Sequence, residues 1–83
     1  MTLDEEFDNA VAAVGRASKD PGNDVKLRLY ALYKQATAGD VAGKRPGFTN
    51  PVGRAKYDAW AKISGMSAAD AKRGYVDAVA AIS

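Results

Sequence analysis

The chain has 83 residues and a mass of 8.7 kDa, which leaves room for one small domain spanning residues 1–83. It contains no cysteine and no histidine, so disulfide bridges, thiolate nucleophiles, histidine-based hydrolase triads and the usual zinc sites are excluded. Residues 1–24 carry two basic and six acidic side chains, whereas residues 25–83 carry ten basic and four acidic ones. This basic second part suggests an anionic partner, although ordinary scatter of surface charge would explain it equally well.

The first predicted helix covers residues 3–17. The segment from Thr2 to Glu5 has the form of a capping box, and its acidic residues suit a helix N-terminus. Four apolar residues then repeat at helical spacing: Phe7, Ala10, Val11 and Val14. Asp20-Pro21-Gly22 predicts a turn after this helix.

The second predicted helix runs from Val25 to Ala38. Asn23 or Asp24 is expected to cap its start, and Gly39 is expected to end it in the left-handed α conformation. Its apolar stripe consists of Leu29, Leu32 and Ala36, with Tyr33 at the margin. The glycines and proline of residues 39–50 predict a loop that is long for neighbouring antiparallel helices and could cross the end of a bundle.

The third predicted helix covers residues 51–63, with Asn50 as N-cap and Pro51 in its first turn. One apolar side of it is formed by Val52, Ala55, Ala59 and Ile63, with Trp60 beside them. The fourth helix follows a second capping-box form, residues 67–70, and continues to about residue 82. Its apolar positions are Ala71, Tyr75, Ala78, Val79 and Ile82. Four helices without a credible strand predict an all-α protein, a small four-helix bundle.

The most unusual segment for function is in the second helix. Tyr30, Tyr33 and Lys34 fall on one side of that helix, and Lys26 falls in the same arc. Phenols and ammonium groups together suit a ligand that has both a stackable ring and a phosphate. The alternative is that the tyrosines pack with their hydroxyls in water while the lysine side chain extends to solvent.

The third and fourth helices add weaker candidates. Arg54 and Lys56 lie close to Trp60 in the sequence, where a charged helix surface over a core tryptophan is the simpler explanation. Gly74, directly before Tyr75, is unfavourable inside a helix unless something approaches its backbone. A packing reason and a ligand are equally plausible at that glycine.

Several function classes fit poorly. Seven aromatic residues, nearly balanced charges and the lack of a recognised motif argue against nucleic-acid binding. The serines have no histidine partner, which argues against an enzyme. No apolar run is long enough to span a bilayer, and no helix combines a basic face with a bulky apolar face, so we expect no stable membrane insertion. The acidic N-terminus is unlike a signal peptide, and we expect a cytoplasmic protein.

Four stretches, taken in order, resemble the acyl-CoA-binding protein family. They are residues 29–40 (LYALYKQATAGD), residues 45–47 (RPG), residues 53–60 (GRAKYDAW), and residues 65–67 (GMS) with Tyr75 beyond them. The order and the gaps also match, and the resemblance extends from Phe7 to Val79.

The resemblance implies a four-helix bundle with up-down-down-up topology. It further implies that the chain binds medium- to long-chain fatty acyl-CoA thioesters and carries them in the cytoplasm without performing chemistry. Tyr30, Lys34 and Lys56 match residues that hold the adenosine 3′-phosphate. Ala31, Leu32 and Tyr33 belong to the same binding stretch, with Tyr33 beside the nucleotide. Tyr75 matches a tyrosine near the pantetheine and acyl portion. We expect a monomer that needs no cofactor and no metal.

Three departures from the family pattern bear on this site. Gly15, next to Arg16, replaces a lysine common in animal members, Val52 replaces a second lysine, and Tyr57 replaces the first tryptophan of the usual WDAW run. The two lost cations put the nucleotide pose in question. One alternative is a helical interaction or regulatory module that kept the fold but uses another ligand. Another is an accessory domain of an enzyme such as an acyl-CoA isomerase, which we disfavour because no linker follows residue 83.

Overall fold

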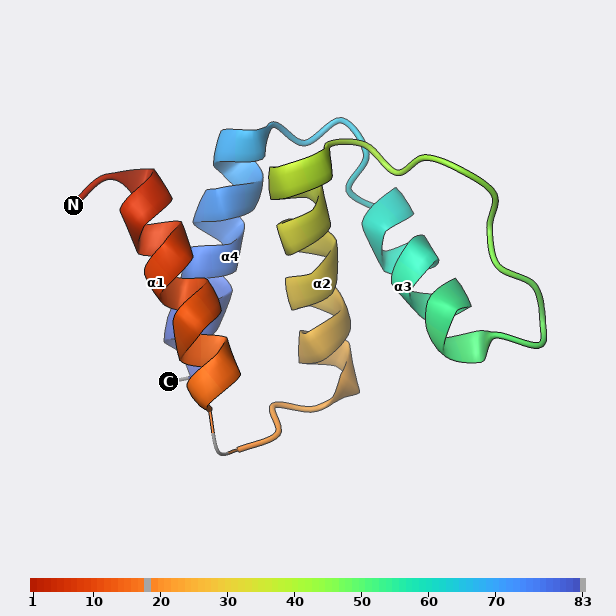
Figure 1. The fold of residues 1–83 in the computed structure, drawn as a ribbon, viewed down its shortest axis with the longest axis horizontal. Helices are drawn as coiled ribbons and strands as arrows, with labels where there is room; N and C mark the ends of the chain where they lie inside the picture. The colour runs from red at the N-terminus through yellow and green to blue at the C-terminus, as the bar shows by residue number, and fades with distance from the viewer. Residues whose placement is uncertain (18, 83) are drawn as a thin grey trace.

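The computed structural model of the chain describes residues 1–17 and 19–82. This part of the chain forms four α-helices and no strand: α1 (Leu3–Arg16), α2 (Asn23–Ala38), α3 (Pro51–Ala61) and α4 (Ala68–Ile82). Helix α1 runs in one direction, α2 and α3 both run in the other, and α4 returns in the direction of α1 (Figure 1). The predicted all-α bundle and its up-down-down-up topology are therefore confirmed.

The first helix begins as its sequence predicts. The Glu5 amide donates to the Thr2 hydroxyl at 3.2 Å, and the Thr2 amide donates to the Glu5 carboxylate at 3.1 Å, which completes the capping box. The helix ends at Arg16, one residue before the predicted end. Two ion pairs join α1 to α4: Asp4 with Lys72 at 2.6 Å and Glu6 with Arg73 at 3.0 Å.

The predicted N-cap of the second helix is wrong, whereas its predicted end at Ala38, directly before Gly39, is confirmed. Helix α2 begins at Asn23, and its N-cap is Gly22, which has a φ of 96° and makes no side-chain cap bond. The Asp20 carboxylate accepts from the Gly22 amide at 2.8 Å and so fixes the turn before the helix. The helix starts two residues earlier than the predicted Val25. Gly39 has the expected positive φ of 85°, but its ψ of −152° lies outside the left-handed α region. The chain therefore leaves α2 in an extended direction, into the loop that reaches α3.

The third helix begins at the predicted residues. The Asn50 side chain accepts from the Gly53 amide at 3.0 Å, and Pro51 occupies the first turn. A Cβ at position 53 would clash with the Asn50 side chain as it lies, so a larger residue there would make the Asn50 side chain shift. Helix α3 ends at Ala61, two residues before the predicted end. In the last helix, the Ser67 hydroxyl accepts from the Asp70 amide at 3.0 Å, as the capping pattern predicts.

Helix α2 is central: it packs against α4 on one side and α3 on the other, and α1 packs against α4. The molecule is flat, with extents of 41 × 28 × 15 Å. One set of buried apolar residues from α1, α2 and α4 forms the core: Phe7, Ala10, Leu29, Leu32, Ala71, Tyr75 and Val79. No residue of α3 is buried, and Val52, predicted on its apolar side, is 64% exposed. A Cβ at Gly74 would lie 3.1 Å from the Leu32 side chain, so close packing explains this interior glycine.

Candidate functional site

A cavity of about 670 Å³ opens between the α1–α2 turn and helices α2, α3 and α4. We call it the tyrosine cavity because Tyr30, Tyr33 and Tyr75 line it, together with Lys56. Its remaining lining is formed by Val14, Ala17, Lys19, Asp20, Pro21, Lys26, Leu29 and Ile82. Four of the seven predicted site residues therefore meet at one cavity, although they come from three helices.

Aromatic contacts fix two of these tyrosines. The Phe7 ring lies 5.1 Å from the Tyr75 ring in an edge-on arrangement and stacks against the Tyr33 ring at 6.0 Å. The Tyr75 ring is 4% exposed, and burial, followed by the nearby Tyr33, raises the pKa of its hydroxyl. That group therefore stays protonated at neutral pH and can donate. Within the described residues, no protein partner accepts from or donates to the hydroxyl groups of the three cavity tyrosines.

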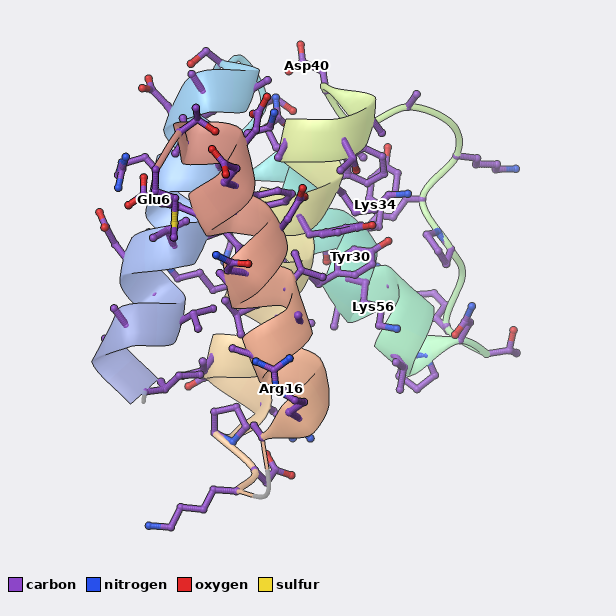
Figure 2. All side chains as sticks on the ribbon, turned by 60° about the vertical axis from the view of Figure 1, so that its left-hand side comes forward. Glu6, Arg16, Tyr30, Lys34, Asp40 and Lys56 are labelled. Carbon is purple, nitrogen blue, oxygen red and sulfur yellow. The ribbon has the colours of Figure 1, made fainter. Side chains whose placement is uncertain are left out.

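The predicted lysines lie over aromatic rings. The Lys56 ammonium sits 5.3 Å from the centre of the Tyr30 ring, and the Lys34 ammonium sits 5.1 Å from the Trp60 ring. Figure 2 shows Tyr30, Lys34 and Lys56 on the same side of α2 and α3. Neither lysine pairs with a carboxylate in the described part of the chain. Both positive charges therefore remain available to an anion.

A buried glutamine positions the ring beneath Lys34. Gln35 is 2% exposed, and its side-chain oxygen accepts from the Trp60 indole nitrogen at 3.1 Å. The same indole nitrogen donates to the Gly39 carbonyl at 2.8 Å. The sequence analysis did not identify this role for Gln35. The available signal was its position three residues after Leu32, which places a polar side chain on the apolar face of α2.

Asp40 extends this polar junction to the turn before α4. The Gln35 amide donates to the Asp40 carboxylate at 2.7 Å and to the Met66 carbonyl at 2.9 Å. The Gly65 amide donates to the same carboxylate oxygen at 2.7 Å. The Gly65 amide and, second, the Gln35 side chain lower the pKa of Asp40 below its ordinary value. The junction therefore ties α2, α3 and the α3–α4 turn together at one end of the molecule.

Three predicted site residues do not line the tyrosine cavity: Lys34, whose ammonium lies over the Trp60 ring, and Ala31 and Leu32. Ala31 and Leu32 are 3% and 1% exposed, and both line a separate cavity of about 450 Å³ between α2 and α3. The Leu32 side chain also belongs to the core. The structure does not bring these two side chains to the tyrosine cavity, because they face a different side of α2.

The structure also shows an ion pair at the cavity that the sequence analysis missed. The Lys26 ammonium contacts the Asp20 carboxylate at 2.8 Å, and both residues line the tyrosine cavity. Lys26, Tyr30 and Lys56 also line an adjoining hollow of about 340 Å³ that reaches Val52. The Lys26 ammonium and the Gly22 amide lower the pKa of Asp20, so its carboxylate is ionised at neutral pH. Cations and apolar surface thus continue along one side of the α2–α3 pair.

The arrangement suits a ligand with two chemically different parts. Phenol hydroxyls and ammonium groups can donate to phosphate oxygens, and the apolar lining can cover a hydrocarbon or a ring. In the described part of the chain, none of the helices has the length and hydropathy to cross a bilayer. The lining of the tyrosine cavity itself favours binding of an amphipathic anion.

Comparisons with known proteins agree on one family. The family model for acyl CoA binding protein matches residues 4–79. An acyl-CoA-binding protein homolog of Manduca sexta is 44% identical over 77 residues, which cover 92% of this chain and 86% of that protein. Enoyl-CoA delta isomerase 2 of Rattus norvegicus is 47% identical over 79 residues, 95% of this chain but only 20% of that protein. The crystal structure of Oryza sativa Acyl-CoA-Binding Protein 2 superposes with a TM-score of 0.90 at 39% identity, covering 96% of this chain and 89% of that one.

Proposed function

The chain belongs to the acyl-CoA-binding protein family, and on that premise we propose that it binds medium- to long-chain fatty acyl-CoA thioesters in the tyrosine cavity. The observation that carries the proposal is the lining of this cavity. Three tyrosines whose hydroxyls have no protein partner among the described residues line one space of about 670 Å³ together with Lys56, which pairs with no carboxylate there. No buried side-chain nitrogen or oxygen of the described residues lacks a partner, so these groups reach solvent, where a ligand can supply acceptors and a counter-charge.

The head of the ligand accounts for the cations. Tyr30, Lys34 and Lys56 hold the adenosine 3′-phosphate in this proposal, and Figure 2 shows how these three side chains share one side of α2 and α3. Two ammonium groups at one site repel each other unless an anion lies between them. The 3′-phosphate removes that repulsion and accepts from both lysines. In this proposal Tyr33 lies beside the nucleotide, and Tyr75, whose ring packs against Phe7, contacts the pantetheine and acyl portion.

The tail of the ligand accounts for the apolar lining. Each buried methylene contributes about 0.8 kcal/mol. About fourteen methylenes would therefore contribute up to about 11 kcal/mol, an upper bound because ordering the chain costs entropy. Affinity should rise with acyl length and level off when the groove is full.

In this proposal the chain is a monomeric cytoplasmic carrier that uses no cofactor, no metal and no nucleic acid and performs no reaction itself. The tyrosine cavity supplies binding groups, and the proposal assigns it no nucleophile or general base. One comparison favours a second candidate function, that of an acyl-CoA-binding domain within a longer enzyme. The chain matches a fifth of the length of enoyl-CoA delta isomerase 2. A domain of this kind could deliver acyl-CoA to an enzyme, and that role would need the same binding site.

Calorimetric titration tests the proposal with four ligands: palmitoyl-CoA, butyryl-CoA, coenzyme A and palmitate. We expect palmitoyl-CoA to bind more tightly than butyryl-CoA, and both free parts to bind much more weakly than the thioester. Equal binding of coenzyme A and palmitoyl-CoA would mean that only the nucleotide is recognised. Absence of palmitoyl-CoA binding by a folded chain would favour the interaction or regulatory module instead.

A further inference from the structure

The end of the molecule formed by α3 and the preceding loop carries an excess of positive charge. Residues 41–62 contain five basic side chains and one acidic one. That acid, Asp58, is engaged by Arg45 through two hydrogen bonds of 2.7 and 2.6 Å. Arg45 is the main cause that lowers the pKa of Asp58, and Arg54 and Lys62 contribute further. In this range, Lys44, Arg54, Lys56 and Lys62 form no ion pair with a carboxylate among the described residues.

An exposed aromatic ring lies beside one of these charges. Phe48 is 89% exposed, and the Arg54 guanidinium lies 4.4 Å from the centre of its ring. Val52, one turn before Lys56, is 64% exposed. We call Lys44, Phe48, Val52 and Arg54 the Phe48 tip. The Phe48 ring does not belong to the core, so burying it against a partner would be favourable.

The opposite end of the molecule has the opposite charge. Helices α1 and α4 lie together at that end, and α3 with its loop lies at the other (Figure 1). Together α1 and α4 carry six acidic and three basic residues. An anionic surface therefore attracts the Phe48 tip and repels the far end, which orients the molecule.

We propose that the Phe48 tip docks reversibly on anionic membrane surfaces, with the Phe48 ring inserted among the lipid headgroups and the surrounding cations against lipid phosphates or carboxylates. Aromatic rings favour the bilayer interface, and basic side chains add attraction to anionic lipids. An acidic protein is the less suitable partner. A single ring on a loop and one exposed valine do not provide the contiguous area of a standard protein interface.

Docking in this orientation would also place the entrance region of the tyrosine cavity near the membrane. Val52 belongs both to the Phe48 tip and to the hollow that adjoins the cavity through Tyr30 and Lys56. A docked molecule would hold that hollow beside the lipid, where an amphipathic acyl thioester partitions. Only this consequence rests on the proposed function, because the docking surface itself requires no bound ligand.

Vesicle flotation with the ligand-free chain tests the proposal. Vesicles of phosphatidylcholine are compared with vesicles that contain about 30% phosphatidylserine, at low and at high salt. We expect binding only to the anionic vesicles, weakened by salt. Phe48→Ala and Arg54→Glu should each reduce the bound fraction about threefold or more, since each removes one part of the contact. Phe48 is exposed and Arg54 is half-buried, so we expect both variants to stay folded, which thermal melts check.

Arg16→Glu on α1 is the matched control, because it makes the same change in net charge far from the Phe48 tip. It should bind anionic vesicles almost as the original chain does, and Phe48→Leu should retain most binding. An equal loss for Arg16→Glu and Arg54→Glu would mean that only net charge matters and would overturn the proposal. So would unchanged binding of Phe48→Ala, or binding to an acidic polypeptide with none to anionic vesicles. Calorimetry with palmitoyl-CoA separates these outcomes from a failure of the ligand proposal.

Discussion

Helices α4 and α3 both pack against α2, but they are held there by different interactions. Helix α4 contributes Ala71, Tyr75 and Val79 to the core, and Gly74 lets the Leu32 side chain approach its backbone. Helix α3 contributes no buried residue. One directed polar contact ties it to α2: the Trp60 indole donates to Gln35. Two more tie it to the preceding loop: the Arg45–Asp58 pair, and the Tyr57 hydroxyl, which donates to the Gly43 carbonyl at 3.0 Å.

Different helices of this chain of 83 residues therefore supply stability and ligand recognition. Apolar burial in α1, α2 and α4 supplies most of the stabilisation, because the hydrophobic contribution grows with the apolar area removed from water. Helix α3 is then free to present lysines and an exposed ring, which a core-forming helix could not keep. Changes in the first region should therefore lower stability, and changes in the second should lower binding with little effect on folding.

Removing a core side chain on α2 should have the largest effect. Leu32 is 1% exposed and contacts the Gly74 backbone region. Leu32→Ala should lower the free energy of unfolding by about 2–5 kcal/mol, because it loses buried methyl groups and leaves a cavity. Urea denaturation measures this change. Val52→Ala on α3 is the control, and a loss above about 0.5 kcal/mol there would contradict the division of roles.

Removing a lysine of α3 should instead affect the ligand. Lys56→Ala should weaken palmitoyl-CoA binding by about 1.5–3 kcal/mol, the scale of a hydrogen bond to a charged group, which is about tenfold to 150-fold. Its thermal melt should stay close to that of the original chain. Lys34→Ala should behave alike, and the two effects should not add, because both lysines share one phosphate.

A ligand without the 3′-phosphate makes the lysine experiment specific. The original chain should bind this acyl-CoA analogue much more weakly, whereas Lys56→Ala should hardly distinguish the two ligands. If the variant loses the same factor on both ligands, Lys56 does not recognise the 3′-phosphate.

Asp40 lies at the junction between α2 and the α3–α4 turn, and its substitution should change how the free energy of unfolding depends on pH. The lowered pKa of Asp40 means that its carboxylate stabilises the fold above the ordinary carboxyl range, and that this contribution is lost as the pH falls through the lowered pKa. Asp40→Asn should therefore be less stable than the original chain at pH 7, and the gap should narrow below about pH 4. Urea unfolding at both pH values measures the gap. A gap that widens in acid would show that the charge of Asp40 does not stabilise the fold.

The smallest change in stability is expected at a residue that belongs to both regions. Tyr75→Phe keeps the ring contacts with Phe7 and Tyr33 and removes a hydroxyl that has no protein partner among the described residues. Unfolding free energy should change by less than about 1 kcal/mol, while palmitoyl-CoA affinity should fall measurably. A collapsed melting temperature with normal binding by the remaining folded chain would assign Tyr75 a purely structural role.

Local patterns predicted the helices better than their junctions. The capping residues Thr2 and Asn50 and the spacing of apolar residues located α1 and α3 to within two residues at each end. Periodicity could not show that Val52 is exposed, because this depends on α3 having only one neighbouring helix. The Gln35–Trp60 contact joins residues 25 positions apart, and local spacing carries no signal for such a pair.

The candidate site was predictable in part for the same reason. Tyr30 and Lys34 share a helix face, so their proximity follows from helical geometry. Their meeting with Lys56 on another helix was implied only by the resemblance to a family, and the structure brings Lys56 to Tyr30. Ala31 and Leu32 were included with their neighbours in the chain, but the helical turn directs them to the other side of α2.

The position of the indole beneath Lys34 gives the chain a built-in optical reporter. Trp60 is its single tryptophan, and the positive charge of Lys34 lies 5.1 Å from the ring while two acceptors fix the ring nitrogen. Indole emission responds to the local electric field. An anion that draws the Lys34 ammonium away from the ring, or neutralises it there, should shift the emission of Trp60 without any label. Loading of the cavity could then be followed in real time by fluorescence, and Lys34→Ala should abolish the shift.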